Sequence, residues 1–166
     1  MFRIGLGYDT HRLTEGFTLM IGGVSVEHDR SLLGHSDADV LLHAVIDALL
    51  GAAGLGDIGE WFPDTDPVNA GRDSAEMLSE VWNKICSLGY RIVNLDCTVL
   101  AEKPKLTPYK EAIKNRIASV LGIEPDQVSI KAKTGERVGP VGREEAISAE
   151  CVVLIVSQQH TEHSTN

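Results

Sequence analysis

Three residues in the first third of the 166-residue chain are of types that bind divalent metal ions. Asp9 and His11 stand two positions apart near the amino terminus, and His43 lies in an apolar stretch further along. One carboxylate and two imidazoles suit Zn²⁺, and three protein ligands leave a fourth position open, as in catalytic zinc sites. We therefore expect these three side chains to hold a metal ion.

Each of the three also has a purely structural interpretation. His43 could be a core histidine, because a buried imidazole must find hydrogen-bond partners, and Asp39 or Asp47 could supply them. The same two carboxylates could instead orient His43 as a metal ligand. Asp9 could cap a turn while His11 lies on the surface.

The segment that carries Asp9 and His11 alternates with the period of a β-strand. Phe2, Ile4, Leu6 and Tyr8 point to one face. The other face carries Gly5, Gly7, Asp9 and His11, so the two candidate ligands project side by side. Glycines on that face leave room for another part of the protein to approach the strand backbone.

The segment that carries His43 predicts a loop followed by a helix over residues 36–50. Ser36 is the expected N-cap, with Asp37 and Asp39 in the first turn, and Gly51 suits the C-terminal cap. The backbone of His35 and Ser36 at a helix N-terminus would offer N–H groups to a phosphate oxygen. An open metal position beside an anion site indicates phosphoryl chemistry.

The rest of the chain predicts further strands and helices without a regular βαβ repeat. Gly22-Gly23 joins two short strands as a hairpin, and the breaker-rich segment 54–67 is either a mobile lid or a set of turns around Asp57, Asp64 and Asp66. Helices are expected from Asp73 to residue 88 and from residue 107 to 121, and strands over 91–101, 128–134 and 147–157. The fold class is therefore α+β, a single mixed β-sheet with helices packed on one side, in one domain over residues 1–157. The polar tail, 158–166, is expected to be disordered.

Composition narrows the class of protein. A net charge of −9 argues against nucleic acid as a partner. The sequence has no apolar run of membrane-spanning length and opens directly on a strand pattern, which argues against a membrane protein and a targeting peptide. Cys86, Cys97 and Cys151 are far apart in apolar segments, as expected of buried thiols in a reducing compartment. We expect a cytoplasmic location, in a bacterium or, for a mature chain, in the stroma of a plastid.

Several short motifs together resemble one enzyme family. They are Gly7–Arg12, the His35–Asp39 block with His43, Gly56–Gly59, Phe62–Asp66, Pro104-Lys105 and Lys133–Glu136. In this order and spacing they resemble the 2-C-methyl-D-erythritol 2,4-cyclodiphosphate synthases over residues 2–157. The resemblance implies a cyclising, CMP-releasing phosphorus–oxygen lyase of the non-mevalonate isoprenoid pathway. In this reaction the 2-phosphate of 4-diphosphocytidyl-2-C-methyl-D-erythritol 2-phosphate attacks the β-phosphate of the same molecule.

The resemblance also implies roles for individual residues. Asp9, His11 and His43 would hold zinc, Glu136 would bind a second divalent cation, Mg²⁺ or Mn²⁺, and His35 and Thr134 would be catalytic. The implied substrate-binding residues are Asp9, Thr10, His11, His35, Ser36, Asp57, Ile58, Gly59, Phe62, Pro63, Asp64, Thr65, Asp66, Ala101, Pro104, Lys105, Leu106, Thr107, Lys133, Thr134, Gly135, Glu136 and Arg143. Among them, Phe62–Asp66 would be the lid and Ala101–Thr107 the cytidine pocket.

Members of this family are homotrimers with active sites between subunits, which the resemblance implies here as well. The chain departs from the family pattern at Pro140, where an aromatic residue that lines an axial cavity is common, and at Lys133, where threonine is common. Two other functions remain open on the residues alone. One is a zinc-dependent phosphohydrolase that uses bound water, and the other is a non-catalytic metal-binding or structural module.

Overall fold

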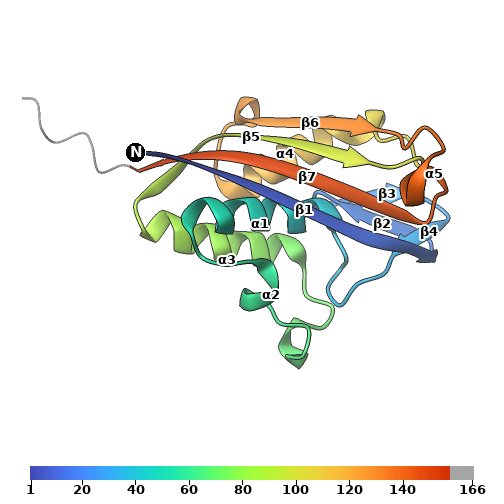
Figure 1. Ribbon diagram of the computed structural model, residues 1–166, viewed down its shortest axis with the longest axis horizontal. Helices are drawn as coiled ribbons and strands as arrows, with labels where there is room; N and C mark the ends of the chain where they lie inside the picture. Colours follow the sequence, from blue (N-terminus) through green and yellow to red (C-terminus); the bar gives the residue numbers. More distant parts are fainter. Residues whose placement is uncertain (158–166) are drawn as a thin grey trace, which may run out of the picture.

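The computed structural model describes residues 1–157 (Figure 1). The strands are β1 (Phe2–Glu15), β2 (Thr18–Ile21), β3 (Val24–Glu27), β4 (Arg30–Leu32), β5 (Tyr90–Leu100), β6 (Val128–Lys133) and β7 (Ala146–Ser157). The helices are α1 (Val40–Ala53), α2 (Ile58–Trp61), α3 (Ser74–Ser87), α4 (Lys110–Leu121) and α5 (Gly139–Gly142). Three short 3₁₀ turns, η1 (Pro67–Asn69), η2 (Thr107–Tyr109) and η3 (Pro125–Gln127), complete the order.

Five of the strands form one mixed sheet in the order β4-β1-β7-β5-β6. β1 and β7 pair antiparallel along almost their whole length, from Phe2 opposite Val156 to Arg12 opposite Ala146. β5 and β6 run parallel, so their carboxyl ends lie at the same edge of the sheet. β2 and β3 form a separate two-stranded sheet, in addition to the single sheet that the sequence predicts.

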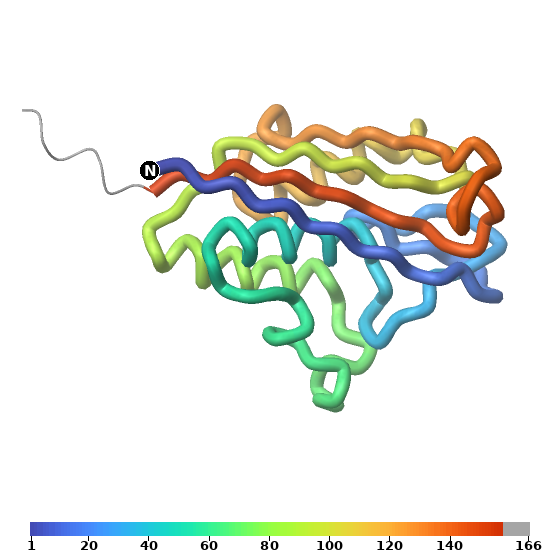
Figure 2. Tube along the Cα trace, in the orientation of Figure 1, coloured from blue at the N-terminus to red at the C-terminus, as the bar shows by residue number. Residues whose placement is uncertain are grey.

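The helices cover one side of the sheet, so the predicted α+β class is confirmed (Figure 1). α1 packs against β1 and β7, α3 packs on α1, and α4 contacts β6 and α3. Figure 2 shows that the chain start lies beside the end of β7, whereas the loops after β1, β5 and β6 gather at the opposite end. None of the helices within residues 1–157 has the length and apolarity to cross a bilayer.

The face of β1 opposite the helices is apolar and open to solvent. Phe2, Ile4, Leu6 and Tyr8 are more than half exposed, and Val152 of β7 lies beside them at 40%. The alternation in the sequence is therefore confirmed, but its large apolar side chains point away from the core. The core side of β1 carries the glycines instead.

These glycines set the distance between β1 and α1. A Cβ added at Gly7 would lie 1.9 Å from the Ala44 carbonyl oxygen, and one at Gly5 would lie equally close to that of Ala48. Only a residue without a side chain allows strand and helix backbones to approach so closely. The room that the two glycines leave is occupied by α1.

The ends of α1 differ from the predicted ones. The helix begins at Val40, capped by Asp39, whose carboxylate accepts the N–H groups of Leu41 and Leu42. The prediction of Ser36 as N-cap is therefore wrong, as is the placement of Asp37 and Asp39 in the first turn. At the other end the helix continues through Gly51 to a left-handed cap at Gly54, φ 72°.

Asp39 caps α1 rather than Ser36 because its carboxylate has further partners. It also accepts the N–H groups of Gly22, at 2.8 Å, and Gly23, at 2.6 Å, from the β2–β3 turn. The side chain is fully buried, and four backbone donors offset the cost of burying it. One carboxylate thus joins the start of α1 to the hairpin.

The other predicted elements agree with the structure to within one to three residues at their ends. The Gly22-Gly23 hairpin, the helix capped by Asp73 and the strands β5, β6 and β7 are confirmed. The helix expected from residue 107 begins as the turn η2 and continues as α4. The predicted polar tail, 158–166, lies outside the described residues.

The contact between β1 and α1 predicts that Gly7→Ala destabilises the protein strongly. The new methyl group would overlap backbone atoms of α1, so strand or helix must move, and overpacking of this kind costs about 3 kcal/mol or more. The free energy of unfolding from urea denaturation measures the loss. The matched control is Gly51→Ala, where an added Cβ meets no atom within 4 Å and a helix interior gains about 0.5–1 kcal/mol from alanine. Unchanged stability of the Gly7 variant would contradict the contact.

Candidate active site

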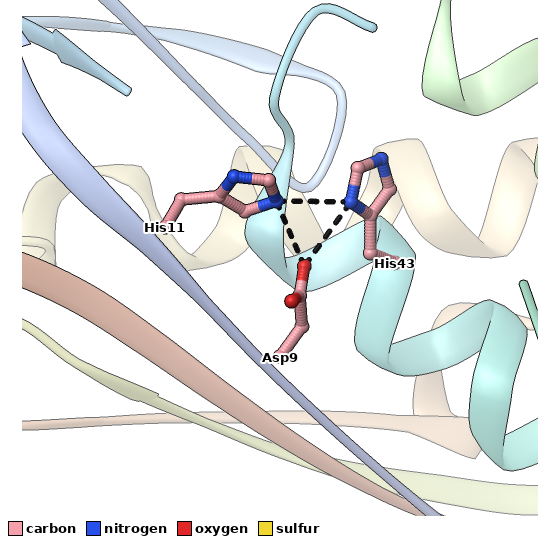
Figure 3. A group of neighbouring side chains, drawn as sticks. All are labelled: Asp9, His11 and His43. Atoms are coloured by element: carbon pink, nitrogen blue, oxygen red, sulfur yellow. Dashed lines mark hydrogen bonds and ion pairs between the residues drawn. The ribbon is translucent and has the colours of Figure 1, made fainter. Parts of the chain in front are cut away.

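Asp9, His11 and His43 converge on one point, as Figure 3 shows. His11 Nε2 lies 2.9 Å from Asp9 Oδ2, His43 Nδ1 lies 3.1 Å from the same oxygen, and the two nitrogens are 3.1 Å apart. In a tetrahedral zinc site with bonds near 2.0–2.1 Å, ligand atoms are about 3.3 Å apart. The three atoms therefore have nearly the spacing of one face of such a site.

The hydrogen bonds behind the two imidazoles show why this group fits a cation. His11 Nδ1 lies 2.8 Å from the Leu33 carbonyl oxygen, which can only accept, so the ring carries its hydrogen there. A neutral His11 then presents a bare lone pair at Nε2. His43 likewise has hydroxyl partners at Nε2, which leaves Nδ1 to face Asp9. Three acceptor atoms in contact require a proton or a metal ion between them.

The electrostatics of the group agree with this requirement. Burial by itself raises the pKa of Asp9, but hydrogen bonds and charge attraction from His11 and His43 outweigh it and hold that pKa well below its usual range. Burial by itself lowers the pKa of His11, but the hydrogen bond that His11 donates to Asp9, together with the charge of Asp9, outweighs burial and raises that pKa. A carboxylate that stays ionised beside two imidazoles is a suitable ligand set for a divalent metal ion.

His43 is not held by the carboxylates that the sequence suggests. Its Nε2 lies 2.9 Å from Ser74 Oγ and 3.1 Å from Ser36 Oγ. The Asp39 carboxylate accepts hydrogen bonds from backbone N–H groups, and Asp47 accepts the N–H of Ile58 at 2.8 Å. The expectation of an Asp39 or Asp47 contact is therefore wrong, because both carboxylates stabilise helix and loop backbone.

The three ligands open into a cavity of about 760 Å³. Its wall brings together several segments that the sequence singled out: His35 and Ser36, Ile58 and Gly59, and Phe62–Thr65. His35 is exposed and lies 3.3 Å from Asp64, which joins the loop before α1 to the predicted lid. His35 and Ser36 stand ahead of the capped helix, so the prediction that they lie at a helix N-terminus is wrong. Both residues line the cavity, and their contact with phosphate stays a prediction.

The predicted lid is anchored at one end. Phe62 is buried, and Cζ of the Arg72 guanidinium lies over its ring, 5.0 Å from the centre of the phenyl ring. Asp57 caps α2 and Asp66 caps η1, so the expectation of turn formers is confirmed for these two residues. Whether residues 62–66 move as a lid stays a prediction.

A second group of predicted residues lies together elsewhere on the molecule. Ala101–Thr107 follows β5 and Lys133–Glu136 follows β6, and the two loops are joined by hydrogen bonds from Ala101 N to Lys133 O and from Gly135 N to Glu102 Oε2. Parallel pairing of β5 and β6 places both loops at one sheet edge. Within residues 1–157, the cavity that contains Asp9, His11 and His43 has no lining residue from either loop.

Four other predicted residues do not line the cavity: Asp57 and Asp66, which cap α2 and η1, and Thr10 and Arg143. Thr10 is on the opposite face of β1 from Asp9, and its hydroxyl contacts Tyr8 Oη and Ser148 Oγ. Arg143 follows α5 and pairs with Glu145 through Nε at 2.9 Å and through a second nitrogen at 3.1 Å. Their substrate-binding roles stay predictions.

Sequence reasoning missed several residues of this region. Leu33, Asn69 and Met77 line the cavity, and Ser74 contacts His43. Ser74 and Met77 fall within the helix that the sequence predicts from Asp73 to residue 88, and the only signal for Ser74 is its place at the start of that helix. Its proximity to His43, 31 positions away, depends on how α3 packs on α1.

Comparison with known proteins gives one consistent result. The model of the YgbB family matches residues 2–156. A 2-C-methyl-D-erythritol 2,4-cyclodiphosphate synthase from Geobacillus kaustophilus is 57% identical over 155 residues, which cover 93% of this chain and 98% of the relative. A synthase of the same name from Synechococcus elongatus is 56% identical, over 93% of this chain and 97% of its own.

Solved structures agree with the sequence relatives. The Plasmodium falciparum IspF in its CDP complex matches with a TM-score of 0.84 and 35% identity, over 95% of this chain and 97% of that one. The bifunctional IspDF from Campylobacter jejuni matches with a TM-score of 0.91 and 38% identity, over 95% of this chain and 42% of its own.

The half-buried Asp47 predicts a pH-dependent change in stability. Burial raises its pKa in the folded protein, aided by the charges of Asp57 and Asp9 and opposed by the Ile58 N–H. A carboxyl whose pKa is raised on folding contributes stability below its unfolded pKa and loses that contribution as the pH rises through the folded value. We therefore expect Asp47→Asn, which keeps an acceptor for Ile58, to raise the melting temperature at pH 7. The gain should shrink as the pH falls towards about 4.

Differential scanning calorimetry of the wild type and Asp47→Asn at several pH values measures this effect. Asp126→Asn, on the exposed turn η3, is the matched control and should show no such pH-dependent gain. A lower melting temperature for Asp47→Asn at pH 7 would mean that the charge itself stabilises this part of the fold.

Proposed function

The chain belongs to the YgbB family and catalyses the cyclodiphosphate-forming step of isoprenoid biosynthesis, and we propose that it does so with a metal ion held by Asp9, His11 and His43. The substrate is 4-diphosphocytidyl-2-C-methyl-D-erythritol 2-phosphate, and the products are 2-C-methyl-D-erythritol 2,4-cyclodiphosphate and CMP. The observation that carries the metal proposal is the convergence of three ligand atoms at about the spacing of a zinc site, on the wall of a cavity.

The reaction itself exchanges one phosphorus–oxygen bond for another. An oxygen of the 2-phosphate forms a bond to the β-phosphorus, and the bond from that phosphorus to the bridging oxygen breaks, so the electron pair leaves with CMP. Nucleophile and target belong to one molecule, so holding the substrate folded supplies much of the rate, and a strong base is unnecessary. In this sense the enzyme is a phosphorus–oxygen lyase.

The chain's own residues would bind and orient the phosphates. A divalent ion, zinc in our proposal, would supply Lewis-acid polarisation of the β-phosphate and offset charge as CMP leaves. His35, exposed on the cavity wall, would position phosphate, and Thr134 would act on it from the other group of loops. Gly59 lines the cavity and Asp57 caps α2 two positions before it, and both would contact the erythritol part.

Glu136 is proposed to bind a second divalent cation, Mg²⁺ or Mn²⁺. Its carboxylate is exposed and accepts a hydrogen bond from the Thr134 hydroxyl at 3.2 Å, so the two predicted residues already lie side by side. Oxygen ligands of this kind suit Mg²⁺, which is held through few carboxylates together with substrate phosphates.

A cytidine pocket in residues 101–107 is supported by the buried ends of the loop. Ala101 and Leu106 are 6% and 4% exposed, while Lys105 between them reaches solvent. A buried apolar floor with a cationic side chain beside it suits a base linked to phosphates. The solved Plasmodium falciparum relative is a CDP complex, which supports nucleotide binding by this fold.

The separation of the two residue groups supports an active site between subunits. The metal ligands come from β1 and α1, and the loops that would bind cytidine and the second cation lie at the carboxyl ends of β5 and β6. The open apolar face of β1 offers a surface for assembly, because a patch of this kind on a folded chain marks an interaction site. We propose a homotrimer in which one protomer supplies the metal ligands and its partner supplies the cytidine loops.

The first test of this function is a ³¹P NMR time course with the cytidine diphosphate substrate, Zn²⁺ and Mg²⁺. The wild type should produce CMP together with two coupled resonances of a cyclic diphosphate. His43→Ala removes a metal ligand and should reduce the rate at least about 100-fold. Release of CMP with only linear phosphates would identify a phosphohydrolase instead.

A structural role for His43 is tested in the same experiment. Circular dichroism and size-exclusion chromatography of His43→Ala establish that the variant is folded and assembled as the wild type is. Full turnover by a folded His43→Ala protein would contradict a catalytic metal site. An unchanged substrate spectrum with metal-loaded wild type would contradict the enzyme activity itself.

The shared active site predicts that two inactive variants restore each other. His43→Ala damages the metal group and Glu136→Ala damages the second cation group, so each homotrimer should be inactive. In a randomly mixed trimer, about a quarter of the interfaces combine two intact groups, and co-expressed variants should recover about a quarter of wild-type activity. If each chain held a complete site, every site in the mixture would carry one lesion and activity would not return.

A further inference from the structure

The far nitrogen of the His43 ring ends in a buried chain of hydrogen bonds. His43 Nε2 lies 2.9 Å from the hydroxyl oxygen of Ser74, the first residue of α3. Ser74 is fully buried and His43 is 9% exposed, so water does not replace this contact. A hydrogen bond between two buried groups of this kind restricts both side chains.

The direction of these hydrogen bonds follows from the last group in the series, the carboxylate of Asp37. The Ser74 hydroxyl donates to Asp37 Oδ1 at 2.5 Å, and a carboxylate can only accept. Ser74 has a single hydroxyl hydrogen, so it presents lone pairs to His43, and His43 must donate through Nε2. A neutral His43 then carries its lone pair at Nδ1, the atom that faces Asp9 and His11.

Asp37 is itself held from two sides. Its second oxygen, Oδ2, accepts the backbone N–H of Ser74 at 3.3 Å, and its own N–H donates to the Arg72 carbonyl at 3.1 Å. The carboxylate thus connects the loop before α1 to the start of α3. Its Oδ1, the acceptor for Ser74, also accepts the backbone N–H of Asp39, the N-cap of α1, at 3.3 Å.

Ser36 is the other hydroxyl near His43, but it does not set the direction of the proton. Its oxygen lies 3.1 Å from His43 Nε2 and accepts the Ala38 N–H at 3.2 Å. No contact to a carboxylate is present for Ser36 among the described residues, and its oxygen also lies 3.5 Å from Ser74 Oγ, so its hydroxyl hydrogen can turn towards His43 or towards Ser74. Only Ser74 has a hydroxyl hydrogen that is committed elsewhere.

We propose that Ser74, held by Asp37, is a positioning residue that keeps the His43 proton on Nε2 and the Nδ1 lone pair available to a divalent cation. The proposal deepens the metal site described above and depends on it. Orientation of a metal-bound histidine by a hydrogen bond to its other nitrogen raises metal affinity, and loss of such a partner weakens it about 10- to 100-fold.

The test measures metal affinity directly, without turnover. Metal-free wild type, Ser74→Ala and Asp37→Asn are titrated with Zn²⁺ in competition with a chromophoric chelator. Ser74→Ala should bind about 10- to 100-fold more weakly, and Asp37→Asn, which no longer offers two acceptor oxygens, should be weakened as well. The matched control is Ser87→Ala, at the other end of α3, where an exposed hydroxyl donates to the Lys84 carbonyl, and its affinity should equal that of the wild type.

Two further measurements separate positioning from general destabilisation. The visible spectrum of Co²⁺ at saturation reports coordination geometry, and Ser74→Ala should alter it whereas Ser87→Ala should not. The conservative variant Ser74→Thr keeps the hydroxyl and should recover most of the lost affinity. Melting temperatures of the metal-free proteins show how much of any change is a loss of fold stability.

The outcomes distinguish this proposal from the function on which it depends. A lower melting temperature for metal-free Ser74→Ala with unchanged Zn²⁺ affinity and Co²⁺ spectrum would overturn the positioning role. A wild type that binds no Zn²⁺ would overturn the metal site and the positioning role together. If Ser74→Ala binds Zn²⁺ more weakly than the wild type, and the wild type produces no cyclic diphosphate, the positioning role is supported and the proposed reaction is contradicted.

Discussion

The close approach of β1 and α1 is the constraint on which the site depends. Gly5 and Gly7 have no side chains, and backbone atoms of α1 occupy the space that side chains would fill, so the strand lies directly against Ala44 and Ala48. His43 precedes Ala44 on the helix, and Asp9 and His11 continue the glycine face of the strand. The same contact therefore brings an imidazole from the helix within hydrogen-bonding distance of both strand ligands. A side chain at either glycine would separate strand and helix and open the ligand group.

Buried polar contacts then hold the ends of these elements in place. Asp39 caps α1 and binds the β2–β3 turn, and Asp47 holds the first N–H of α2. Each carboxylate is stabilised by backbone donors, because a buried acceptor without partners would cost more than folding could recover. The consequence for the site is that neither is available to His43, and hydroxyl groups from Ser74 and Ser36 take that place.

The two groups of candidate residues lie on different parts of one sheet, and this arrangement relates the fold to the proposed assembly. Parallel pairing of β5 with β6 brings the loops 101–107 and 133–136 to one end of the sheet. The metal ligands lie between β1 and α1, and β7 separates β1 from β5 in the sheet. The outer face of β1 carries large apolar side chains that no part of the chain within residues 1–157 covers well. A reaction that needs both groups is most simply served by a second copy.

What the sequence determined by itself was local. Strand alternation placed Asp9 and His11 on one face with the glycines, apolar spacing identified the helices, and residue type together with family resemblance singled out the ligand set, since these signals depend on neighbours within a few positions. The start of α1 was misplaced because Ser36, Asp37 and Asp39 are all good caps, and only contact with Gly22 and Gly23 selects Asp39. The partner of His43 and the separation of the two residue groups were decided by tertiary structure alone, because they depend on how α3 packs on α1 and on the order of strands in the sheet.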